Sequence, residues 1–210
     1  MPSAAAGTSP GLTRLDAPGV PRGVVLALHG GRPRSRRRVD GRSASWRLML
    51  GLTRALAQQA EREAVSVWTL RYRHRGWNGG VDPIEDARWA LAEVRRELGE
   101  VPVVLLGHSM GARAALHVAD DPVVAGVVAL APWIEGDTPV DTLTGRRLVA
   151  AHGRRDRLTS YAATRAYVDR ATAVARSARF VDMGDLGHYL IRGHARWAEL
   201  ARSESLRLLA

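Results

Sequence analysis

One serine stands between two glycines where a predicted strand meets a predicted helix. The apolar residues 101–106 predict a buried strand, Gly107-His108-Ser109-Met110-Gly111 follows, and the alanine-rich residues 112–119 predict a helix. A sharp strand-to-helix turn crowds the backbone, and glycine lacks the Cβ atom that would clash there. Such a turn holds a serine hydroxyl at its tip, beside a helix N-terminus that favours negative charge. The pattern therefore predicts that Ser109 is a nucleophile rather than a structural turn residue.

A serine hydroxyl is a weak nucleophile until a base takes its proton and a third group fixes the tautomer of that base. His188 follows the last predicted strand in a glycine-containing loop and is the predicted base, with His194 as its rival. Asp156, just past the penultimate predicted strand, is the predicted acid, although a solvated aspartate paired with a nearby arginine would look the same. Glu135 and Asp137 come one strand earlier and could serve in a variant geometry.

Acyl transfer also requires N–H donors for the oxyanion of the tetrahedral intermediate. The amide of Met110, at the start of the predicted helix, is one expected donor. The second is expected after His29-Gly30, from the amide of Gly31 or of Arg32. Glycines in this turn would let the backbone approach a substrate closely.

Three other histidines border these motifs. His29 and His108 flank the oxyanion turn and the serine, and we predict that they make structural hydrogen bonds. His152 fits a turn at the end of a strand.

The elements that must position these residues alternate between strands and helices. Unbroken apolar runs predict strands covered on both faces, and apolar residues at helical spacing predict amphipathic helices. The predicted strands are 23–28, 65–70, 101–107, 123–130, 148–151 and 178–183, and the predicted helices are 45–62, 82–98, 112–119, 161–171 and a last one through 197–208. Asp82 is the predicted N-cap of the second helix, with Pro83 and Glu85 in its first turn, and Ser160 that of the fourth. This alternation predicts one α/β domain with a doubly wound, mostly parallel sheet, helices on both faces and an active site beyond the carboxyl ends of the strands.

The composition limits the classes of protein to consider. Residues 1–22 contain four prolines and little periodicity, and predict an irregular N-terminal leader before a domain over 23–210. The N-terminus lacks the basic and apolar regions of a signal peptide, and no apolar run approaches the roughly 20 residues of a membrane span. The chain has no cysteine, so neither disulfides nor thiolate chemistry is expected. These features favour a cytoplasmic protein with no membrane partner.

The net charge is +10, and every one of the 31 basic residues is arginine. Arginine without lysine is typical of a GC-rich genome, although attraction of anionic substrates or surfaces is the alternative. A nucleic-acid binder would show a basic stripe with interleaved aromatic residues, whereas these arginines are spread along the chain. We therefore expect no nucleic-acid partner, and nothing indicates the oligomeric state.

The chain resembles the α/β-hydrolase fold family. The motifs that carry the resemblance lie in the family's order over about residues 23–210: His29-Gly30-Gly31, Gly107-His108-Ser109-Met110-Gly111, His152-Gly153-x-x-Asp156 and Gly187-His188. The resemblance implies that Ser109 is the nucleophile, Asp156 the acid and His188 the base. It also implies oxyanion amides from Met110 and the turn after His29.

Two departures from the family pattern affect the fold. The sequence reaches the family's third strand at about residue 23, so the first edge hairpin is missing or confined to residues 1–22. The connection between residues 130 and 147, where many members insert a cap or lid, is about sixteen residues long. We therefore expect a compact hydrolase without a cap domain.

The predicted activity is the hydrolysis of small carboxylic esters or thioesters, without a metal or organic cofactor. The expected pocket walls are Gly30, Arg32, Trp77, Trp133 and Tyr189, together with the loop 32–42, whose six arginines either steer anionic substrates or are simply solvated. A peptidase or amide hydrolase on the same residues is one alternative. A non-catalytic binding protein of the same fold is another, because fold does not fix function.

Overall fold

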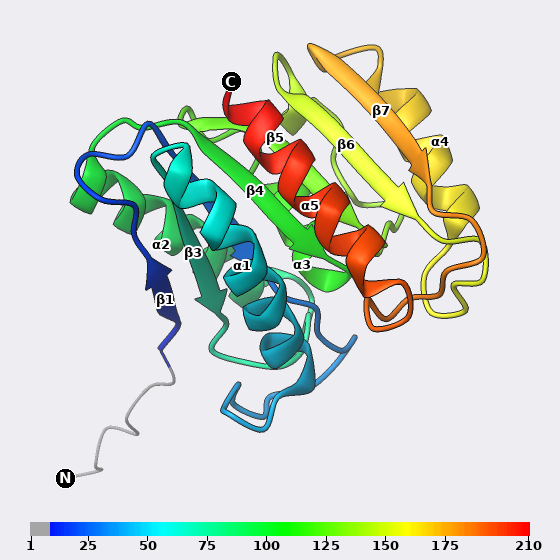
Figure 1. The fold of residues 1–210 in the computed structure, drawn as a ribbon. Helices are drawn as coiled ribbons and strands as arrows, with labels where there is room; N and C mark the ends of the chain where they lie inside the picture. Colours follow the sequence, from blue (N-terminus) through cyan, green and yellow to red (C-terminus); the bar gives the residue numbers. More distant parts are fainter. Residues whose placement is uncertain (1–8) are drawn as a thin grey trace, which may run out of the picture.

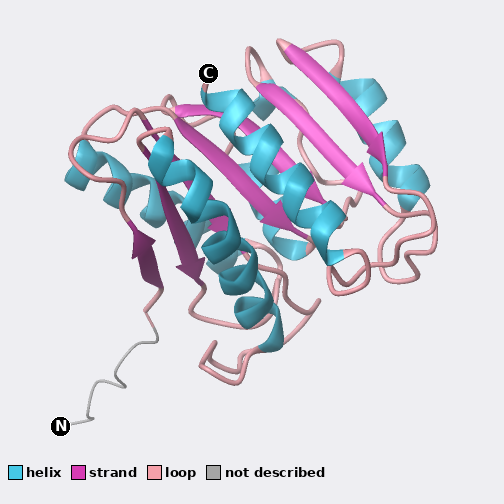
Figure 2. Cartoon of the chain, in the orientation of Figure 1, coloured by secondary structure: helices cyan, strands magenta, loops and turns pink. Residues whose placement is uncertain are grey.

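The computed structural model describes residues 9–210 and is built around a seven-stranded, mostly parallel sheet (Figures 1 and 2). The strands are β1 (Gly11–Leu15), β2 (Gly23–Leu28), β3 (Val65–Arg71), β4 (Val103–His108), β5 (Val124–Leu130), β6 (Arg147–His152) and β7 (Ser177–Asp182). Their order across the sheet is β1-β3-β2-β4-β5-β6-β7, and only β1 runs antiparallel to its neighbour. The carboxyl ends of the six parallel strands therefore meet at one edge.

Five helices cover the two faces of the sheet. They are α1 (Ala44–Arg62), α2 (Val81–Leu98), α3 (Met110–His117), α4 (Tyr161–Ala171) and α5 (His194–Leu209). Helices α1 and α5 lie on the face toward the viewer in Figure 1, and α2, α3 and α4 lie behind. Alternate residues of one strand serve the two layers: Leu26 packs with α2 and α3, whereas Val25 and Ala27 pack with α1 and α5. The predicted α/β sheet with helices on both faces is confirmed.

The N-terminal segment requires a correction. Within residues 1–22, predicted to be an irregular leader, Gly11–Leu15 form β1 and pair with β3, while residues 1–8 lie outside the described part of the chain. The side chain of Arg14 lies over the ring of Trp68, whose Nε1 donates to Asp16 at 2.6 Å. This short edge strand depends on partners more than fifty residues away, which a local pattern does not reveal.

The start of α2 also differs from its prediction. The helix begins at Val81, after Gly80 in a left-handed conformation, so Asp82 is not the N-cap. Its carboxylate instead faces Nδ1 of His74 at 2.8 Å. The predicted cap of α4 is confirmed, because Oγ of Ser160 accepts from the backbone N–H of Ala163 at 3.1 Å.

The connection between β5 and β6 contains one 3-10 turn, Asp141–Leu143, and no inserted domain. The strand ends are therefore left uncovered by a cap within residues 9–210. No helix in that range combines the length and the apolar character needed to cross a membrane.

Candidate active site

The turn between β4 and α3 holds Ser109 in a strained conformation, with φ 54° and ψ −116°. A Cβ atom at Gly107 would lie 2.4 Å from Cα of Ala112, and one at Gly111 would lie 2.1 Å from the carbonyl oxygen of Leu28. Both approaches are far inside van der Waals contact, so this turn requires glycine on each side of the serine. Strain of this kind costs about 1–3 kcal/mol and is typical of functional sites.

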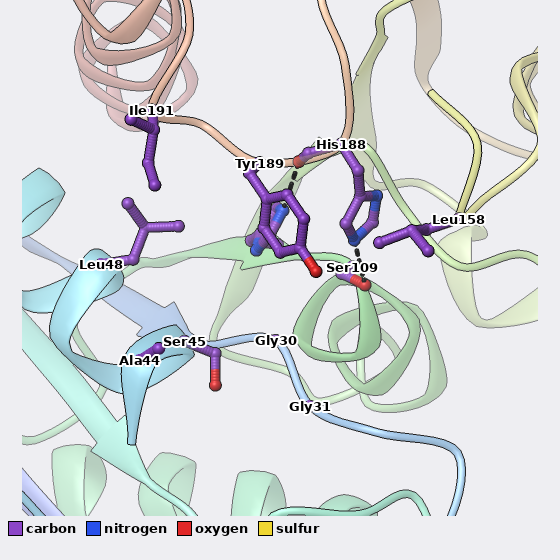
Figure 3. A pocket seen from close by; sticks show the side chains of 11 residues that line it. Gly30, Gly31, Ala44, Ser45, Leu48, Ser109, Leu158, His188, Tyr189 and Ile191 are labelled. Atoms are coloured by element: carbon purple, nitrogen blue, oxygen red, sulfur yellow. Dashed lines mark hydrogen bonds between the residues drawn. The ribbon is translucent and has the colours of Figure 1, made fainter. Parts of the chain in front are cut away.

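Three side chains from separate strand ends meet at this turn. Oγ of Ser109 lies 3.0 Å from Nε2 of His188, which the dashed line between the two residues marks in Figure 3. Nδ1 of His188 lies 2.7 Å from Oδ2 of Asp156. The structure thus brings together the three residues predicted as nucleophile, base and acid. His188 donates through Nδ1–H, and its Nε2 is left to accept the serine proton.

The carboxylate of Asp156 is fully buried. It accepts hydrogen bonds from five donors, which are the backbone N–H groups of Leu158 and Thr159, the Thr159 hydroxyl, Nδ1 of His188 and Nε2 of His152. Burial alone would raise the pKa of Asp156, but the bonds from His152 and His188, with those from the two backbone N–H groups, outweigh it. They hold this pKa well below its usual range. The acid is therefore ionised and fixed in place.

The two candidates for the second oxyanion donor, Gly31 and Arg32, differ in whether the backbone N–H is already bonded. The N–H of Arg32 donates to the carbonyl of Arg75 at 2.8 Å and is not available. Among residues 9–210, the N–H groups of Gly31 and Met110 have no acceptor. Of the two alternatives for the second oxyanion donor, the geometry leaves Gly31. A Cβ there would lie 2.3 Å from Sδ of Met110, so glycine keeps the two groups close.

His29 fixes the turn after β2 through two hydrogen bonds. Its Nδ1–H donates to the carbonyl of Gly30 at 2.6 Å, and its Nε2 accepts from the backbone N–H of Tyr72 at 3.4 Å. Burial lowers the pKa of His29 to about 4, so the ring is neutral at pH 7, as this donor and acceptor pattern requires.

His108 connects the serine turn to the loop that carries the base. Its Nε2–H donates to the carbonyl of His188 at 3.1 Å, and the two rings lie 5.0 Å apart. Burial is the main cause that lowers the pKa of His108 to about 4, and two protonated rings at this distance would also repel each other. The predicted structural hydrogen bonds of His29 and His108 are both present.

A cavity of about 430 Å³ opens over Ser109. Figure 3 shows Tyr189, Ile191, Leu48 and Leu158 around it. Its lining consists of Gly30, Gly31, Ala44, Ser45, Leu48, His108, Ser109, Leu158, His188, Tyr189 and Ile191. Gly30 and Tyr189 were expected here, whereas the α1 residues, Leu158 and Ile191 were not. No arginine of the loop 32–42 lines the cavity, so Arg32 as a wall residue is corrected.

Trp77 and Trp133 do not line this cavity either. Their rings lie on the guanidinium group of Arg113, at 4.4 and 4.6 Å, and line a separate hollow. Arg113 pairs with Asp137, and Nε1 of Trp133 donates to Glu135.

These contacts also decide between the alternative acids and bases. Asp137 and Glu135 are engaged at the Trp77–Trp133 stack and do not contact His188, and His194 begins α5 on the surface. Within residues 9–210, no group of three or more His, Cys, Asp or Glu side chains is arranged to hold a metal ion.

Known structures share the fold of this chain. A search of the curated proteins found no match. Among solved structures, an alpha-beta serine hydrolase homologue from Coxiella burnetii is 18% identical with TM-score 0.72, covering 93% of this chain and 91% of its own. A serine hydrolase without a lid from Xanthomonas campestris is 18% identical with TM-score 0.67, covering 98% and 97%. Esterase 2 of Thermogutta terrifontis, phosphonylated by cyclosarin, is 13% identical with TM-score 0.70, covering 98% and 92%.

These likenesses concern the fold. The sequence profile described as the alpha/beta hydrolase family matches residues 24–206, which is most of the chain. The match includes Ser109, Asp156 and His188, which we call the Ser109 cluster. The chain belongs to the alpha/beta hydrolase family.

Proposed function

We propose that the protein is a serine hydrolase that cleaves carboxylic esters or thioesters through an acyl-enzyme on Ser109. The observation that carries the proposal is the continuous line of contacts from Oγ of Ser109 through His188 to the carboxylate of Asp156. A buried, ionised aspartate fixes the ring so that its free nitrogen faces the serine hydroxyl. This arrangement activates a serine for attack on a carbonyl carbon.

In the acylation step, Oγ of Ser109 attacks the carbonyl carbon while Nε2 of His188 takes the serine proton. The negative charge that develops on the carbonyl oxygen faces the N–H groups of Met110 and Gly31, and loss of one such donor typically costs about 3–4 kcal/mol of transition-state stabilisation. When the tetrahedral intermediate collapses, the bond to the alcohol or thiol breaks and His188 returns the proton to the departing oxygen or sulfur. Water then repeats the sequence on the acyl-enzyme, with His188 again acting as base.

The cavity favours a small substrate with an apolar acyl group. Its volume of about 430 Å³ lies near the lower end of the range of small-molecule sites, about 300–1,000 Å³. Leu48, Leu158 and Ile191 provide apolar surface around it. Because no cap covers the strand ends in the part of the chain that the structure describes, residues 9–210, these side chains and Tyr189 set the acyl length themselves. Short and medium acyl chains are therefore expected to be cleaved faster than long ones.

The test is hydrolysis of p-nitrophenyl acetate, butyrate and octanoate by the wild type and by Ser109→Ala. We expect turnover in the wild type, loss of at least about a thousandfold in the variant, and highest kcat/KM for one of the two shorter esters. Labelling by a fluorophosphonate in the wild type but not in Ser109→Ala provides an independent readout. If the folded wild type neither hydrolyses an ester nor takes the label, a non-catalytic binding protein is favoured. If it hydrolyses anilides but not esters, an amidase is favoured.

A further inference from the structure

A further hollow, distinct from the one at Trp77 and Trp133, adjoins the cavity on the side of His188. It has a volume of about 510 Å³ and shares His188, Tyr189 and Ile191 with the cavity over Ser109. Its other lining residues are three arginines, an aspartate and a glycine: Arg155, Arg157, Arg192, Asp185 and Gly187. A molecule bound at the serine therefore extends into the hollow along His188, Tyr189 and Ile191.

The hollow is positively charged. Arg155 pairs with Asp185 at 3.1 Å, which leaves that pair neutral overall. Arg157 and Arg192 are exposed and form no ion pair with any carboxylate in the described range 9–210. Two uncompensated guanidinium groups thus face one depression, and a planar guanidinium is well suited to binding carboxylate or phosphate.

Apolar side chains separate these charges from the serine. Leu158, Tyr189 and Ile191 are 60%, 61% and 72% exposed, and all three line the cavity over Ser109. They are half of the six large apolar side chains that are exposed in residues 9–210. Arg157 precedes Leu158 in the chain, and Arg192 follows Ile191. The rim is therefore apolar on the inside and cationic on the outside, which fits a substrate with one apolar and one anionic part.

From this arrangement we propose that the hollow formed by Arg157, Arg192, Tyr189 and Ile191 is the subsite for the leaving group, and that it selects esters or thioesters whose alcohol or thiol part carries a carboxylate or phosphate. The proposal rests on the ester hydrolysis proposed above. The apolar acyl group occupies the cavity beside Gly31 and Leu48, and the anionic part of the leaving group lies against the two arginines.

The reaction itself places the leaving group on this side. When the bond between the carbonyl carbon and the leaving oxygen or sulfur breaks, its electron pair stays on that atom. The same atom then takes the proton that Nε2 of His188 received from Ser109, and the acyl group remains on Oγ. The departing molecule must therefore contact His188, which lines both the cavity and the cationic hollow.

The test compares 4-(butyryloxy)benzoate with its methyl ester, which has the same acyl group but an uncharged leaving group. The wild type is measured beside Arg157→Gln, Arg192→Gln and the double variant. In the double variant, kcat/KM for the anionic ester is expected to fall about three- to tenfold more than for the methyl ester, through KM, because each exposed charge pair contributes modestly. High salt should remove the difference between wild type and variant.

Arg36→Gln is the matched control, since it removes one exposed charge in the loop 32–42, away from the cavity lining. Its ratio of the two esters should equal that of the wild type. An unchanged ratio in the double variant, or an equal fall in Arg36→Gln, overturns the subsite. So does salt-sensitive binding to anionic phospholipid vesicles that is lost in the double variant while the ester ratio stays constant, which would assign the patch to a lipid surface. If the wild type hydrolyses neither ester, the proposed function itself is wrong.

Discussion

Nε2 of His152 lies 3.0 Å from Oδ2 of Asp156, the same oxygen that Nδ1 of His188 approaches at 2.7 Å. One carboxylate oxygen therefore serves two histidines. His152 is fully buried at the end of β6, and its other nitrogen, Nδ1, lies 2.8 Å from Oγ1 of Thr164. Its ring is fixed on both sides, so it holds the carboxylate in the direction that His188 requires.

Replacing His152 tests this positioning role. In His152→Phe, we expect kcat to fall roughly ten- to a hundredfold with little change in KM, because a hydrogen bond to a charged group contributes about 1.5–3 kcal/mol. The carboxylate then has one donor fewer and attracts the proton of His188 more strongly. Activity requires neutral His188, so the acid limb of the rate profile should move to higher pH.

His152→Gln is the matched variant, since its side-chain amide can donate over a similar reach. It should restore most of kcat and return the acid limb toward that of the wild type. An acid limb that stays in place in His152→Phe, with activity lost in proportion to unfolded protein, would reduce His152 to a packing residue. Profiles of kcat and kcat/KM on p-nitrophenyl butyrate between pH 5 and 9 distinguish these cases.

Asp156→Asn should lower kcat by roughly 10⁴ without unfolding the protein, because an amide can hold His188 in the wrong tautomer. Asp169→Asn, an exposed substitution on α4, should leave kcat unchanged. Both variants are compared with the wild type on p-nitrophenyl butyrate at pH 8, with circular dichroism as the check on folding. A loss of less than about tenfold in Asp156→Asn would mean that another group orients the base.

Gly31→Ala tests the second oxyanion donor. The new Cβ would lie 2.3 Å from Sδ of Met110 and 2.7 Å from the carbonyl oxygen of Arg75, so the turn must shift. Because the displaced N–H acts only on the charge of the transition state, kcat should fall about 10²–10³-fold while KM changes little. Gly41→Ala, where a Cβ meets open space, is the control and should retain the wild-type kcat. Equal kcat in the two variants would exclude Gly31 as a donor.

The Ser109 cluster is predictable from sequence because parallel strands share a carboxyl edge. Ser109, Asp156 and His188 each follow a recognisable apolar strand, so their meeting requires only the topology of the sheet. The walls of the cavity are different. Ala44 and Leu48 reach it because α1 packs mainly against β3, the neighbour of β2, and the apolar stripe of α1 does not reveal which end of the helix faces Ser109.

Trp77 and Trp133 were predicted to line the cavity over Ser109, and the structure places them elsewhere. Trp77 and Trp133 follow strands near the predicted site, as wall residues should, but the guanidinium group of Arg113 lies against both rings. Arg113 belongs to α3, and its side chain is buried against the two rings and paired with Asp137. The positions of these residues in the sequence do not predict that contact. His152 lies four residues before Asp156 in the sequence. This spacing fits a histidine in a turn as well as a histidine that hydrogen-bonds to Asp156, so the sequence did not distinguish the two roles.

The buried side chains of His29 and His108 make the free energy of unfolding depend on pH. The pKa values of His29 and His108 are lowered to about 4 in the folded protein, chiefly by burial, from 6.5. Between those values the unfolded chain binds more protons than the folded one, so the free energy of unfolding rises with pH across this window and is lost on acidification. Each shift corresponds to about 3 kcal/mol over the whole window.

His108→Gln removes one of these titrations, while its amide can still donate to the carbonyl of His188. Urea unfolding at pH 7.5 and pH 4.5 should show a free energy of unfolding that falls by about 2–3 kcal/mol less in His108→Gln than in the wild type. The exposed His194→Gln is the control and should fall as much as the wild type. An equal fall in all three proteins would mean that burial does not keep His108 neutral, and the hydrogen bond that ties the serine turn to the base would then have to tolerate a charged ring.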